Sequence, residues 1–130
     1  MFRTLLAVVI LSAGLAPVAR AQEATIRPAV IPALPAGEAE HLLRMLVQAQ
    51  VAASNCPGPY DTAAPFLLMS AAMEAVMDQI GLDDQGLEQI YAPVRAAVDK
   101  PAFCTTETAR IGYVLDMLVF WGGALTLIRG

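Results

Sequence analysis

The sequence predicts an all-α protein, a disulfide-clipped up-down-up-down four-helix bundle that follows a proline-rich N-terminal arm. Apolar residues recur at helical spacing in four segments of residues 38–130, and capping residues, glycines or prolines separate these segments. Strands are not expected, because β-branched residues are scattered and no stretch alternates strictly between apolar and polar. The only two cysteines, Cys56 and Cys104, fall between helical segments.

Residues 1–21 have the layout of a secretory signal peptide. Arg3 makes the start basic, Leu5–Leu11 is an unbroken apolar run, and small residues precede a cleavage site between Ala21 and Gln22. Cleavage leaves 109 of the 130 residues, a length suited to one domain. We therefore expect a periplasmic or secreted protein, in a compartment where two cysteines can pair.

The charge of the mature chain argues against nucleic-acid binding. Removal of the signal peptide takes away Arg3 and Arg20, so six basic side chains remain against twelve acidic ones, a formal charge of −6. The basic residues form no stripe, and a phosphate backbone would be repelled.

Residues 22–37 are predicted to form an extended, polyproline-like arm, flexible or laid along the surface. Pro28, Pro32 and Pro35 follow one another at close spacing with small residues between them. The sequence favours a plain spacer between the cleavage site and the domain. An arm that docks on the domain is the alternative.

The first helix is predicted over Glu38–Ser54, where apolar residues form one face. Glu38 and Glu40 lie in its first turn and suit the helix dipole. Pro57, Gly58 and Pro59 cannot continue it. The predicted buried face consists of Leu42, Met45, Leu46, Ala49 and Ala53.

The second helix is predicted to start at an N-cap, Asp61 or Thr62, with Pro65 in its first turn. Gly81 is expected to end it as a left-handed residue. The predicted buried stripe consists of Phe66, Met69, Met73, Val76, Met77 and Ile80.

The third helix is predicted to begin at Asp83 or Asp84 and to end before Lys100 and Pro101. Its apolar period continues through Pro93, so we expect one kinked helix and not two short ones. That period is carried by Leu87, Ile90, Tyr91, Val94 and Val98.

The last helix is predicted to start after Thr105 or Thr106 and to run to about Ile128. Within 111–128 the only charged residue is Asp116. A central core helix is favoured, with Asp116 at the surface or hydrogen-bonded at a helix contact. The core volume is expected from Val114, Leu115, Leu118, Phe120, Trp121, Leu125 and Ile128.

Two alternatives stay open for residues 111–128. The length reaches the lower limit of a membrane anchor, although an acid at the centre of a span costs about 2.5–3.5 kcal/mol. The small surface at Gly122, Gly123 and Ala124 would suit a close neighbour, including a second copy of the chain in a homo-oligomer.

The cysteine positions support the predicted topology. In an up-down-up-down bundle the loops that carry Cys56 and Cys104 lie at the same end, so a disulfide within the ~7 Å limit between Cα atoms is natural. The wide spacing of the pair and the lack of an adjacent basic side chain favour a structural role over a redox one.

Candidate chemical groups all have a structural interpretation that the sequence favours. His41, the only histidine, sits beside Glu40 and is expected at the surface. The stripe Met69, Met73 and Met77 could ligate copper(I) or haem, but methionines at helical spacing usually pack in a core. The acids Asp83, Asp84 and Glu88 suit the start of the third helix.

No catalytic motif is present in the sequence, and we expect no enzyme activity, cofactor or metal. The predicted function is the binding of a protein or an apolar ligand, with the partner unidentified. The alternatives are a membrane-anchored accessory subunit, held by the last helix, and a small metal- or haem-binding carrier or enzyme.

The chain resembles small secreted two-cysteine helical proteins of unknown function found among proteobacteria. The matching features are the signal peptide, a helix running into Cys56 and Pro57, the Gly81–Asp84 helix start, and Cys104 opening a final helix. In cysteine number and separation it is also similar to the acid-activated periplasmic chaperones, from which it departs by a whole helix before Cys56 and by few lysines.

Overall fold

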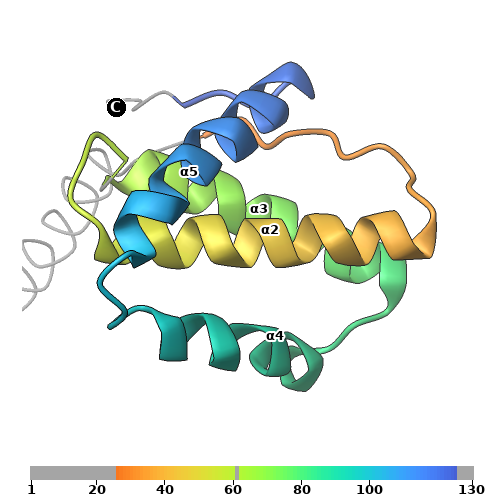
Figure 1. Ribbon diagram of the computed structural model, residues 1–130. Helices are drawn as coiled ribbons and strands as arrows, with labels where there is room; N and C mark the ends of the chain where they lie inside the picture. Colours follow the sequence, from red (N-terminus) through yellow and green to blue (C-terminus); the bar gives the residue numbers. More distant parts are fainter. Residues whose placement is uncertain (1–25, 61, 126–130) are drawn as a thin grey trace, which may run out of the picture.

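The computed structural model describes residues 26–60 and 62–125, which form a bundle of four α-helices. Along the chain the helix direction alternates, so the predicted all-α bundle is confirmed (Figure 1). The expected signal peptide and its cleavage site at Ala21 and Gln22 lie outside the described residues. The helices are α2 (Ala36–Asn55), α3 (Ala63–Ile80), α4 (Asp84–Ala97) and α5 (Phe103–Phe120).

Helix α2 is the centre of the bundle and packs against each of the other three helices (Figure 1). Leu43, Leu46 and Val47 on this helix have no solvent exposure. Between these large residues stand buried alanines, which let α3 and α5 approach the α2 backbone closely. The central position of α2 therefore follows from a buried surface wider than one stripe.

The ends of α3 and the start of α4 agree with the sequence predictions. Thr62 occupies the N-cap position of α3, but its side chain makes no capping hydrogen bond, and Asp61 lies outside the described residues. At the other end Gly81 has φ +68°, and the Leu82 N–H donates to the Met77 carbonyl oxygen at 3.0 Å. A left-handed glycine with this bond is a Schellman ending, which satisfies carbonyl groups that the helix leaves free.

Helix α4 begins after Asp83, whose side chain accepts a hydrogen bond from the Gly86 N–H at 2.9 Å. The helix continues through Pro93, as the apolar period predicted. Of its side chains only Ile90 is buried. This helix is therefore attached to the bundle by a narrow strip of contact, almost all of it with α2.

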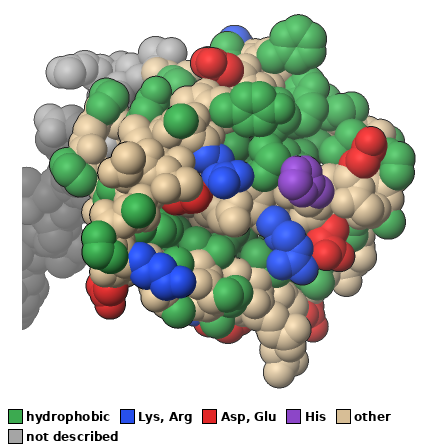
Figure 2. Space-filling view, viewed as in Figure 1, with side chains coloured by type: hydrophobic (Ala, Val, Ile, Leu, Met, Phe, Trp, Pro, Cys, Tyr) green, Lys and Arg blue, Asp and Glu red, His purple; other side chains and the backbone are tan. Residues whose placement is uncertain are grey.

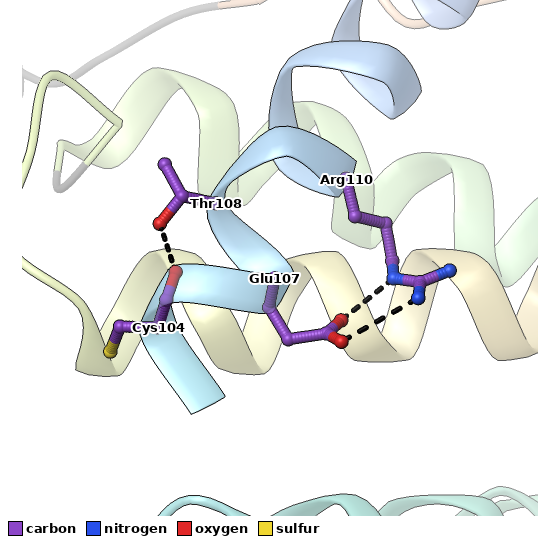
Figure 3. Close-up of polar contacts among 4 residues, drawn as sticks. All are labelled: Cys104, Glu107, Thr108 and Arg110. Atoms are coloured by element: carbon purple, nitrogen blue, oxygen red, sulfur yellow. Dashed lines mark hydrogen bonds and ion pairs between the residues drawn. The ribbon is translucent and has the colours of Figure 1, made fainter. Parts of the chain in front are cut away.

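Helix α5 begins at Phe103, three to four residues before the predicted start, which was after Thr105 or Thr106. Phe103 is buried against the core, and its N–H donates to the Lys100 carbonyl oxygen at 3.0 Å, so a turn already leads into the helix. Cys104 consequently lies in the first turn and not in a loop. Its carbonyl oxygen accepts the Thr108 hydroxyl at 2.5 Å (Figure 3).

The prediction that the last helix runs to about Ile128 is wrong, because α5 ends at Phe120. Gly122 has φ +92°, and its N–H donates to the Val119 carbonyl oxygen, while the Gly123 N–H donates to the Leu118 carbonyl oxygen, both at 2.9 Å. These two bonds form a Schellman ending, which stops the helix inside the apolar run. Ile128 lies outside the described residues.

The early end of α5 changes which of its residues form the core. Val114, Leu115 and Leu118 are buried, and Asp116 is exposed, as predicted. The expectation of buried aromatic volume at the C-terminus is wrong. Phe120 is 84% exposed and Leu125 41% exposed, and Trp121 is only half-buried. Two residues beyond Leu118, Phe120 lies on the opposite side of the helix, which explains its exposure.

Membrane-crossing was one of the alternatives for the last helix. Within 26–60 and 62–125, no helix combines the length and the apolar character that a bilayer crossing requires.

The proline-rich arm lies along the surface (orange in Figure 1), so the plain-spacer interpretation is wrong for residues 27–35. The Val30 N–H donates to the Trp121 carbonyl oxygen at 2.8 Å, and the Ala124 N–H donates to the Arg27 carbonyl oxygen at 2.9 Å. Farther along, the Gln79 side chain accepts the Leu34 N–H at 3.2 Å and donates to the carbonyl oxygen of Pro32 at 2.9 Å. These bonds hold the arm to both α3 and the segment after α5.

Candidate ligand-binding groove

The predicted disulfide between Cys56 and Cys104 is present, with 5.5 Å between the Cα atoms. Cys56 is the C-cap residue of α2 and is buried in the core, whereas Cys104 is partly exposed. The bond therefore joins the end of the central helix to the start of α5. Both its position and its burial suit a structural role.

The one histidine is exposed, as predicted, and Figure 2 shows it on the surface. Its neighbour Glu40 is engaged elsewhere, because Arg44 donates to it at 3.0 Å. Within the described part of the chain, no three His, Cys, Asp or Glu side chains are placed to hold a metal ion.

The methionine stripe of α3 divides into two parts. Met69 has no solvent exposure and Met73 is buried, so both pack in the core as expected. Met77 is half-buried. Met73 and Met77 also line an open groove on the side of α3 that faces α4. Their thioether side chains are flexible and fit irregular apolar surfaces.

This groove, called here the α3–α4 groove, has a volume of about 670 Å³. It exists because α3 and α4 separate after Gly81 and each packs on α2, while they make little contact with each other. Its size falls in the range of about 300–1,000 Å³ typical of small-molecule sites. It is lined by Gln50, Phe66, Ser70, Met73, Glu74, Met77, Asp78, Leu82, Asp83, Asp84, Leu87 and Tyr91.

The floor of the α3–α4 groove is a polar cluster drawn from three helices. Gln50 of α2 is only 3% exposed and is the one buried polar residue of the described core. Its amide nitrogen donates to the Ser70 hydroxyl oxygen at 2.6 Å, and its amide oxygen accepts the hydroxyl proton of Tyr91. The Tyr91 oxygen also lies 3.8 Å from the sulfur of Met73. All three polar side chains are therefore satisfied without a ligand.

Tyr91 is held from both sides. Its hydroxyl points to Gln50, and the Arg95 guanidinium carbon lies 5.2 Å from the centre of its ring. Arg95 also forms an ion pair with Glu88. Burial raises the pKa of Tyr91 above its usual value of 10.0, because a phenolate would lose its contact with water.

We expect Tyr91 to remain protonated when pH rises past 10. Its pKa is higher in the folded than in the unfolded chain, so this group stabilises the fold fully below pH 10 and loses that effect as pH rises through the raised pKa. Absorbance titration at alkaline pH should show a tyrosine ionisation step above pH 10 that disappears in Tyr91→Phe. If the same late step persists in that variant, the assignment to Tyr91 is wrong.

The rim of the groove is acidic. Glu74 and Asp78 project from α3, and Asp83 and Asp84 lie at the start of α4, all four exposed. The predicted capping role is confirmed for Asp83. No Lys or Arg is among the residues that line the groove. The mouth therefore combines negative charge with the apolar walls beneath it.

Phe66 was predicted to be buried, but it is 44% exposed and lines the groove. Sequence patterns indicate no role for Gln50 or Ser70, and they place Tyr91 only in an apolar stripe. One signal could have indicated Gln50, which lies one turn after Leu46 on the buried face of the first helix. A polar residue at such a position needs a buried partner.

A second cavity, of about 260 Å³, lies between α2, α4 and α5. Its charged residues are already paired. Arg44 contacts Glu40, and Glu107 accepts from Arg110 Nε at 2.7 Å (Figure 3). It is smaller than most small-molecule sites. The α3–α4 groove is therefore the stronger candidate.

No family model, curated protein or solved structure matches this chain. The resemblance to small secreted two-cysteine helical proteins therefore stays a prediction. What the groove does has to follow from its own side chains.

Proposed function

We propose that this is an exported binding protein that holds an apolar small ligand in the α3–α4 groove and catalyses no reaction. The groove itself is the observation that carries the proposal. The signal-like residues 1–21 and the Cys56–Cys104 disulfide support export, because disulfides persist mainly in oxidising compartments.

The chemistry of the walls favours an apolar ligand. Met77, Leu82 and Leu87 are half-buried and face the groove. An apolar ligand would cover them and remove this surface from water, worth about 25 cal/mol for each Å² buried. The polar floor would orient one end of the ligand, as a few polar groups do in most ligand sites. Because Gln50 is already satisfied, binding need not break the floor apart.

The construction of the groove favours adjustment to a ligand. One wall, α4, has Ile90 as its single buried side chain and follows the left-handed turn at Gly81. A helix attached so narrowly can shift on α2 at small cost, since few apolar contacts are lost. The opposite wall is α3, which is anchored in the core by Leu68 and Val76. The groove therefore has one rigid and one adjustable wall.

We expect a neutral apolar fluorophore, N-phenyl-1-naphthylamine, to bind one molecule per chain with increased emission. Leu87→Trp should weaken this binding at least tenfold, because the larger ring occupies the groove. Leu67→Trp is the matched control, since Leu67 is an exposed residue of α3 outside the groove. Its affinity should equal that of the unchanged protein.

Circular dichroism and melting curves would establish that both tryptophan variants are folded. The proposal fails if the fluorophore does not bind the unchanged protein, or if the two variants bind it with equal affinity.

A further inference from the structure

We propose that the ligand of the α3–α4 groove is a cationic amphiphile, an alkyl chain that ends in an ammonium group. This inference depends on the proposed function and narrows it to one ligand class. The alkyl chain would lie along Met77 and Leu87, and the ammonium group would lie at the acidic rim beside Glu74 and Asp78.

The charge at the rim is uncompensated on the α3 side. Glu74 and Asp78 lie one helical turn apart and are both exposed. Over residues 26–60 and 62–125, neither forms an ion pair or a side-chain hydrogen bond. Like charges at this spacing repel each other on a helix surface. A cation between them would offset this repulsion by two attractions.

The helix ends strengthen the field on the same side. Asp78 lies in the last turn of α3, where the helix dipole adds partial negative charge. Asp83 and Asp84 stand at the start of α4, where the partial positive charge offsets theirs, and Asp83 is also bonded to the Gly86 N–H. The most negative part of the rim is therefore at Glu74 and Asp78.

The nearest cation on α4 does not cancel this charge. Arg95 lies over the ring of Tyr91, is paired with Glu88, and is not among the residues that line the groove. The ammonium group is therefore attracted to the α3 side of the rim, away from Arg95.

The rim suits an ammonium group better than a metal ion. Divalent cations require several oxygen ligands around one point. Among the described residues the acidic side chains do not converge in this way. Carboxylates spread along an open rim attract a bulky cation without coordinating it.

The size of the groove suits a small molecule. Its volume of about 670 Å³ lies within the range of about 300–1,000 Å³ typical of small-molecule sites, to which an alkyl chain with one head group belongs.

The test is a calorimetric titration of the full mature chain with three amphiphiles of equal chain length, each below its critical micelle concentration and at low salt. We expect dodecyltrimethylammonium to bind about tenfold more tightly than neutral dodecyl maltoside, and dodecyl sulfate to bind most weakly. In the double variant Glu74→Gln/Asp78→Asn, the preference for the cation should fall to less than about threefold, with affinity for the maltoside unchanged.

The matched control is Asp99→Asn/Asp116→Asn, which makes the same charge change at two exposed acids outside the groove. This control variant should bind dodecyltrimethylammonium about tenfold more tightly than dodecyl maltoside, as the unchanged protein does. Equal affinity for the cation and the maltoside, or an equal loss in the control, would overturn the cationic ligand while leaving apolar binding intact. If none of the three amphiphiles binds, the proposed function fails as well.

The melting temperature of Glu74→Gln/Asp78→Asn should not be lower than that of the unchanged protein, because the variant removes a repulsion.

Discussion

Replacing Cys56 and Cys104 together by alanine should lower the free energy of unfolding by about 4 kcal/mol. The disulfide joins residues 48 apart in the sequence and so removes much of the conformational freedom of the unfolded chain. It also fixes the start of α5 against the end of α2, which no other covalent link does. Against a typical domain stability of about 5–15 kcal/mol, this loss is large.

Urea unfolding of the double variant and of the unchanged protein measures this difference. The unchanged protein under reducing conditions is the control, and its stability should fall to about that of the variant. A decrease below about 1 kcal/mol would show that the unfolded chain is held together by other contacts.

Leu118→Ala should cost about 2–5 kcal/mol, whereas Phe120→Ala should cost less than about 1 kcal/mol. Leu118 has no solvent exposure, so its truncation leaves a cavity among residues of α2, α3 and α5. Phe120 is larger but 84% exposed, so its truncation removes little packing. The smaller side chain, Leu118, is therefore expected to give the larger loss of stability, although side-chain size alone suggests the reverse.

Both variants belong to the same helix and can be compared by the same denaturant titration. Equal losses for the two would mean that Phe120 is covered in solution, by a second copy of the chain or by residues outside those described. A small loss at Leu118 would mean that the core around α5 closes on the cavity.

The helices were predictable where their boundaries depend on local chemistry. Asp83 as an N-cap and Gly81 as a left-handed residue each act within one turn, so sequence neighbours are sufficient to recognise them. The bundle topology was predictable for a similar reason, since short connections place successive helices antiparallel.

The end of α5 was not predictable by the same reasoning, because two signals conflict. The apolar run continues past Phe120, which favours a longer helix, whereas Gly122 and Gly123 favour an ending. Contacts with the N-terminal arm favour the ending. Val30 bonds to Trp121, and Arg27 bonds to Ala124, and these bonds hold residues 121–124 against the arm. That contact joins opposite parts of the sequence, so no local window contains it.

The candidate groove was also outside the reach of sequence patterns. It results from the separation of α3 and α4 on α2, and apolar periodicity gives the faces of helices but not the distances between them. Met73, Met77 and Tyr91 were correctly placed on apolar faces, yet the same pattern describes a closed core and an open groove. The disulfide was predictable because the bundle topology places both cysteines at one end, and the exposed His41 was predictable because it sits beside the charged Glu40.

The docked arm has a consequence for the order in which the molecule is assembled. The bond between Arg27 and Gly122 joins residues 95 apart, so it closes a loop that includes all four helices. Loops of this length close late, after the local contacts that shorten them have formed. The arm is therefore expected to dock on a bundle that has already folded. The first described residues of the chain are then the last to reach their native contacts.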